Sequence, residues 1–158
     1  TGFGIPPQME TVMSEQEPQA PAGSFAEHLA QSPSGGLSGG QSNKVELFVQ
    51  GGSIGWLGED SGQWAVVTSQ DAAVPLKAYV HTDGVLYYCN AGDDSRYLSV
   101  SDGYHYVGFY NWVGARGWTL NGGVLTSLYT NAPLSIYSTG NGYLYANSGY
   151  TPVTVQFH

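Results

Sequence analysis

Five short turn dipeptides recur at almost constant spacing through the last hundred residues of this 158-residue chain. Each pairs a small polar residue with glycine: Ser61-Gly62, Asp83-Gly84, Asp102-Gly103, Asn121-Gly122 and Asn141-Gly142. Their glycines are 22, 19, 19 and 20 residues apart. Such dipeptides favour tight hairpin turns, and no segment between them keeps apolar residues at helical spacing for ten residues. The spacing therefore predicts an all-β domain built from regular hairpins.

A longer period overlies the turns. The chain divides into units 45–84, 85–123 and 124–158, which are 40, 39 and 35 residues long. The second and third units open alike, with Val85-Leu86 and Val124-Leu125 directly after a glycine turn. Each unit reads as strand, strand, turn, strand, strand. The odd-numbered turns therefore lie inside units, and the even-numbered turns join one unit to the next.

Three units of four strands resemble the β-trefoil architecture over residues 45–158. The resemblance implies a closed barrel of six strands, capped at one end by hairpins of the other six, with the first strand paired to the last. It is a resemblance of architecture and not of a particular family. Ricin-type lectins of this fold carry a Gln-x-Trp signature, which is absent here because Gln63-Trp64 are adjacent and Gln156 precedes Phe157. A β-sandwich and a solenoid of 20-residue hairpins are the alternatives.

Residues 1–43 differ in composition from the rest. Gly, Pro, Ser and Gln make up 23 of these 43 residues, which include no Lys or Arg. We predict an anchoring arm over 1–31, a flexible Gly/Ser-rich linker over 32–43 and the β-domain over 44–158. Ser24 and Glu27 have capping-box spacing, so a short helix over 25–31 is expected in an otherwise extended arm. The apolar residues expected to anchor the arm are Phe3, Ile5, Phe25 and Leu29.

Charge and motif content argue against several classes of function. Four Lys and Arg against twelve Asp and Glu give a formal charge of −8, which disfavours nucleic acid and anionic membrane surfaces as partners. The single cysteine, Cys89, lies in an apolar run and is expected to be a buried hydrophobic residue. No nucleophile motif, phosphate loop or metal-ligand spacing is present. We therefore expect a protein that is not an enzyme and uses neither cofactor nor metal.

The aromatic residues suggest a binding surface. Residues 44–158 contain 19 Trp, Tyr and Phe residues, several of them near turns. Such side chains fill cores, form protein interfaces, or stack on sugars beside carboxylates and amides. The candidate glycan site is the group in the middle unit that combines acids, an amide and aromatics: Asp93, Asp94, Tyr110, Asn111 and Trp112.

Two functions remain open. In the first, the chain is a structural display protein: the arm binds other subunits of an assembly, such as a virion decoration or surface fibre, and the β-domain faces outward, where it could contact cell-surface glycans. Residues 1–20 lack the pattern of a signal peptide, which favours a virion within this class. In the second, the chain is a secreted β-trefoil lectin. We favour the first.

Overall fold

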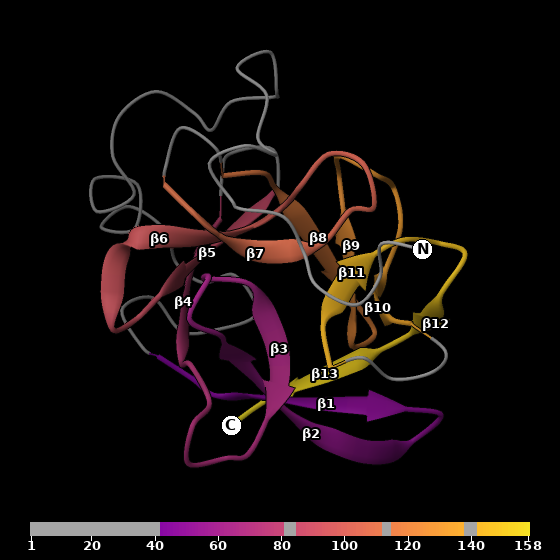
Figure 1. Ribbon diagram of the computed structural model, residues 1–158, viewed down its shortest axis with the longest axis horizontal. Coiled ribbons are helices and arrows are strands. Elements are labelled where there is room, and N and C mark those ends of the chain that lie inside the picture. Colours follow the sequence, from indigo (N-terminus) through magenta and orange to yellow (C-terminus); the bar gives the residue numbers. More distant parts are fainter. Residues whose placement is uncertain (1–41, 81–84, 112–114, 138–141) are drawn as a thin grey trace.

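The computed structural model describes residues 42–80, 85–111, 115–137 and 142–158, and this part of the chain is all β, with no helix (Figure 1). The arm, its predicted helix and its anchoring residues lie outside the described residues. The strands are β1 (Val45–Val49), β2 (Gly52–Glu59), β3 (Ala65–Thr68), β4 (Leu76–Val80), β5 (Leu86–Asn90), β6 (Asp93–Val100), β7 (Val107–Tyr110), β8 (Trp118–Asn121), β9 (Val124–Ser127), β10 (Leu134–Ile136), β11 (Leu144–Ala146), β12 (Thr151–Pro152) and β13 (Thr154–Phe157).

Antiparallel ladders join these strands in two sheets. A ten-stranded sheet has the order β3-β2-β1-β13-β9-β8-β5-β6-β7, with β4 paired to β5, and a three-stranded sheet has the order β11-β10-β12. The first strand pairs with the last, with Val45 opposite Phe157, as expected. The closed barrel was a wrong expectation for these ladders, because their path ends at β3 and β7. Where further ladders would have joined strands of this sheet, the structure has only isolated bridges, such as Asn43 with Leu76 and Trp64 with Gly108. The path of paired strands therefore stays open.

Three of the predicted turns are confirmed as hairpins. Ser61-Gly62 joins β2 to β3, Asp102-Gly103 joins β6 to β7, and Asn121-Gly122 joins β8 to β9. Asp83-Gly84 and Asn141 lie outside the described residues. The first hairpin differs in one respect: the left-handed residue is Gln63, with φ of 68°, and not Gly62.

The strands β3, β7 and β11 surround the centre of the view in Figure 1 and are joined in a ring by backbone hydrogen bonds. In each bond the donor is the N–H of the third residue of one strand. The acceptor is the carbonyl of the residue two positions before the first residue of the next strand. The three bonds are Phe109 to Gln63 (2.9 Å), Ala146 to His105 (3.0 Å) and Val67 to Gly142 (2.9 Å). All three accepting residues have positive φ, at 68°, 63° and 87°.

Alternation along these strands divides the apolar residues between two clusters. Ala65, Val107 and Leu144, each the first residue of its strand, are fully buried in the main core. Leu57, Leu98 and Leu134 join them from the hairpin partners β2, β6 and β10, each only 1% exposed. The residues just before the three strands are Trp64, Tyr106 and Tyr143, and they lie in a separate aromatic cluster. The ring of strands therefore separates the main core, which is mostly aliphatic, from a cluster made of aromatic residues.

Candidate functional site

Of the predicted glycan-site residues whose side chains the structure describes, Asp93 and Asn111 are exposed, whereas Tyr110 is buried. Asp93 begins β6, and its carboxylate accepts hydrogen bonds from the hydroxyl (2.6 Å) and the N–H (3.1 Å) of Ser95. These bonds lower the pKa of Asp93. Tyr110 ends β7 with only 3% of its surface exposed, so its ring cannot stack on a sugar. Asn111 is exposed, whereas Trp112 and the side chain of Asp94 lie outside the described residues.

A second acidic side chain lies near Asp93. Burial, followed by the negative charge of Asp93, raises the pKa of Glu59 at the end of β2. Asn90 donates a hydrogen bond from its amide to Glu59 Oε1 at 3.2 Å. This contact ties the first unit to the second. Within the described ranges, no group of three or more His, Cys, Asp and Glu side chains is arranged to hold a metal ion.

The strongest concentration of binding chemistry is a tyrosine-rich cluster over β3, β7 and β11, which we call the tyrosine cap. Its floor is buried and consists of Trp64, Tyr106, Tyr110 and Tyr145. Its rim is more accessible and consists of Tyr104, Tyr137, Tyr143 and Tyr150. Tyr104 is 47% exposed, the most exposed large hydrophobic residue among those described.

Edge-to-face contacts hold the rim of the tyrosine cap on its floor. Tyr150 packs edge-on against Tyr145 and Tyr137, with ring centroids 4.9 and 5.2 Å apart, and Tyr104 meets Tyr106 at 6.5 Å. Burial raises the pKa of Tyr150 and of Tyr143, and the nearby Asp60 carboxylate adds to the effect at Tyr143. Both phenols therefore remain neutral hydrogen-bonding groups well above neutral pH.

The tyrosine cap was missed by the sequence analysis, although a signal was available. Trp64, Tyr106 and Tyr143 all follow the left-handed residues that close the ring of strands. Each of these aromatic residues lies within three positions of a turn glycine, Gly62, Gly103 or Gly142, but the candidate site was predicted from acids and amides beside aromatics. That criterion therefore selected Tyr110, a buried member of the same cluster.

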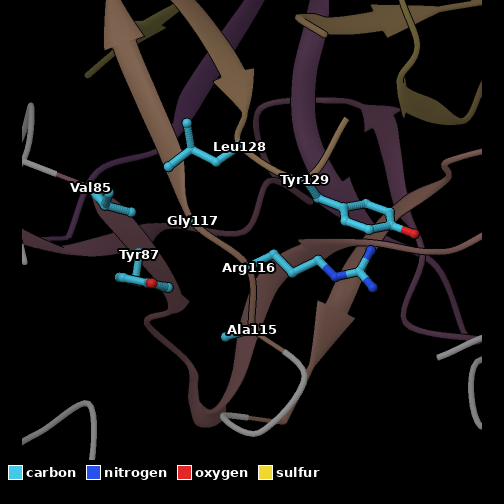
Figure 2. Close-up of a pocket in the computed structure, with 7 residues that line it drawn as sticks. All are labelled: Val85, Tyr87, Ala115, Arg116, Gly117, Leu128 and Tyr129. Atoms are coloured by element: carbon cyan, nitrogen blue, oxygen red, sulfur yellow. The ribbon is translucent and has the colours of Figure 1, made fainter. Parts of the chain in front are cut away.

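A separate pocket of about 200 Å³ lies between the second and third units, and Figure 2 shows the residues that line it. Val85, Tyr87 and Leu128 form an apolar part, where Gly117 has no room for a Cβ against Val85. The Arg116 side chain runs along the Tyr129 ring on the other side of Gly117 (Figure 2).

The buried Arg116 side chain lines this pocket and contacts three other residues. Its guanidinium carbon lies 3.3 Å from the centroid of the Tyr129 ring, and its Nη1 donates to the carbonyl of Val100 at 2.8 Å. Asp102 accepts a hydrogen bond from the Tyr129 hydroxyl at 2.6 Å and lies 3.6 Å from Arg116 Nη2. Burial lowers the pKa of Arg116 to about 10, so the side chain remains charged at neutral pH. These contacts indicate a structural role for Arg116.

Two negative findings complete the description. In the part of the chain that the structure describes, no helix is long and apolar enough to cross a membrane. The comparisons with family models, with curated proteins and with solved structures give no match to this chain.

Proposed function

We propose that this protein is a non-enzymatic structural component of a larger assembly, of the virion-decoration or surface-fibre type. Residues 1–31 anchor the chain to other subunits, and the β-domain is displayed outward on the linker 32–43. The observation that carries the proposal is the abrupt change in amino-acid composition at residue 43. There a segment rich in Gly, Pro, Ser and Gln is followed by a domain made of successive β-strands.

We also propose that the β-domain has the β-trefoil architecture. Three sets of strands support this: β1–β4, β5–β8 and β9–β13 each contain a hairpin that contributes one strand to the central ring. Leu57, Leu98 and Leu134 occupy matching positions in these sets, opposite the ring donors. The bridge between Asn43 and Leu76 further brings the start of the domain to β4.

The place where the linker enters the domain suits display. The Asn43 amide donates to the carbonyl of His158 at 2.7 Å, and the His158 N–H donates to the carbonyl of Lys44 at 2.9 Å. Together with the β1–β13 ladder, these bonds hold the first strand by its pairing with the last. A pull on the linker would therefore be resisted by a full ladder rather than by one strand end.

Deletion of residues 1–31 tests the proposal. The truncated protein should keep the circular dichroism spectrum and unfolding transition of the β-domain but fail to enter its assembly. Limited proteolysis, read by mass spectrometry, should trim the chain up to about residue 41 in the free protein and spare it in the assembled state. Incorporation of the truncated protein at the full-length level would refute the arm as the anchor.

The second candidate function, a secreted lectin, is favoured by one observation, the partly exposed rings of the tyrosine cap. A glycan array probed with the full chain separates the two proposals. Specific glycan binding that survives deletion of 1–31 would support the lectin, and Trp112→Ala would show whether the site predicted from sequence takes part.

A further inference from the structure

The pocket between the second and third units plays no part in either proposed function. It encloses about 200 Å³ and is lined by residues from three places in the chain. Val85 precedes β5 and Tyr87 lies in it, residues 115–117 lead into β8, and Leu128 and Tyr129 follow β9. A group bound in this pocket would therefore contact both units.

The wall of the pocket on one side of Gly117 is made of carbon. A Cβ added to Gly117 would overlap Val85 Cγ1. It would also lie 3.5 Å from Leu128 Cδ1 and 3.5 Å from Tyr87 Cζ, so three side chains converge on this backbone position. The Leu128 side chain is 41% exposed. The apolar wall therefore borders the solvent, from which a ligand could reach it.

The charge on the other side of Gly117 is already balanced within the protein. Arg116 is the one charged residue among those that line the pocket, and its side chain is 1% exposed. Its guanidinium is covered by the Tyr129 ring, donates to the carbonyl of Val100 and faces Asp102 (Figure 2). The Tyr129 hydroxyl also donates to Asp102. The pocket therefore offers apolar surface, and a charged ligand would lose hydration there without gaining a new counter-ion.

We propose that this pocket binds a free small molecule with one uncharged ring, such as a substituted benzene. An apolar cavity of roughly 150 Å³ accommodates benzene, so about 200 Å³ has room for one ring with a small substituent. The aliphatic side chains and the Tyr87 ring supply the contacts that such a ring makes. The inference goes beyond the proposed functions, because it depends neither on the arm nor on a glycan.

An occupied pocket would strengthen a narrow junction of the large sheet. In the described chain, β5 and β8 pair through a single residue pair, Leu86 with Trp118. The pocket is lined by residues next to both strands and by Leu128 after β9. A ligand that binds only the folded state stabilises that state. The ring compound would therefore act as a structural ligand of the domain.

Nuclear magnetic resonance of the full-length protein tests the site directly. Toluene is titrated into protein that is isotope-labelled at the Val and Leu methyl groups. The methyl signals of Val85 and Leu128 should shift together, with a dissociation constant of about 1 mM or below. Nuclear Overhauser contacts from the toluene ring should reach these methyls and not those of Leu57 in the main core. Contacts confined to the main core, or the absence of saturable binding, would overturn the pocket as the site.

A matched pair of ligands tests the chemical class. Benzoate has the ring of toluene, with a carboxylate where toluene has a methyl group. It should bind at least tenfold more weakly than toluene, because the carboxylate loses its hydration in an apolar pocket. Binding of benzoate as tight as that of toluene, or tighter, would show that the Arg116 charge is available to a ligand. That result would overturn an uncharged ring as the ligand class.

The chain also offers a matched pair of variants. Leu128→Ala removes part of the apolar wall and should weaken toluene binding at least threefold. Ile54→Ala is the control, because Ile54 is a partly buried aliphatic residue of β2 that does not line the pocket. It should leave the dissociation constant unchanged. Equal losses in the two variants, or a loss in neither, would overturn the assignment of the site. Neither side chain is fully buried, so circular dichroism should show a folded domain in each case.

Discussion

The indole nitrogen of Trp118 donates a hydrogen bond to the carbonyl oxygen of Leu98, at 3.2 Å in the interior of the domain. In the other two units, a backbone N–H donates the hydrogen bond to the equivalent leucine carbonyl. There the bonds are Val74 to Leu57 (2.9 Å) and Val153 to Leu134 (2.8 Å). The middle unit thus replaces a main-chain donor by a side chain, which makes its packing depend on one residue.

We therefore expect Trp118→Phe to destabilise the domain by about 2–4 kcal/mol. The change leaves the buried Leu98 carbonyl without this donor and opens a small cavity, and both effects lower the free energy of unfolding. Urea unfolding followed by circular dichroism measures the change. The control is Trp56→Phe, because Trp56 is only partly buried. An equal loss in the two variants would contradict a special role for the indole donor.

Gln63 provides a prediction about backbone conformation. It sits in the left-handed region, which costs a residue with a Cβ roughly 1–2 kcal/mol. Gln63→Gly should therefore raise the free energy of unfolding by up to ~1 kcal/mol, and the β-branched Gln63→Val should lower it by ~1 kcal/mol or more.

Gln156 in β13 is the matched control for Gln63, because it is an exposed strand residue outside the left-handed region. There the order should reverse, with Val tolerated and Gly destabilising. The same ranking of Gly and Val at the two positions would show that φ at Gln63 does not determine its preference.

The sequence predicted the elements of the fold better than their closure. Turn dipeptides report on local backbone geometry, so the hairpins at Asp102-Gly103 and Asn121-Gly122 could be read directly. Barrel closure depends on pairings between residues far apart in sequence, such as Asn43 with Leu76. No local pattern encodes whether such a contact extends into a ladder or remains a single bridge.

Side-chain environments were harder to predict for the same reason. The alternating run Tyr104-His105-Tyr106 predicts a solvent-facing strand position for His105, but His105 precedes β7, is half-buried and has positive φ. Tyr110 was placed in the candidate glycan site beside Asn111, yet it is buried in one cluster with Trp64 and Tyr145. Cys89 was predicted correctly as buried, since it lies inside an apolar run that packs on both faces of β5.

Arg116 and Tyr129 should be energetically coupled. Each contacts Asp102, and they also contact each other through the guanidinium and the ring. Arg116→Met keeps much of the side-chain volume but removes the charge, and we expect it to cost about 1–3 kcal/mol of stability. Tyr129→Phe removes the hydroxyl donor to Asp102 and should cost about 1 kcal/mol.

A double-mutant cycle measures this coupling. The double variant should lose less stability than the two single variants together, by at least ~0.5 kcal/mol, because each change disrupts the same Asp102 contact. Strict additivity would show that the three side chains act independently.

His105 predicts a pH dependence of stability. Burial lowers its pKa below the usual 6.5, against a smaller opposing effect of Asp102. The unfolded chain therefore binds more protons than the folded one between the two pKa values, and stability rises with pH across that window. This contribution is fully present above about pH 6.5 and is lost as the pH falls. His105→Asn tolerates positive φ and removes the titration, so the stability difference between wild type and variant should shift in favour of wild type from pH 5 to pH 8. Urea unfolding at intervals of half a pH unit measures this difference, and a flat difference curve would show that His105 does not titrate differently in the two states.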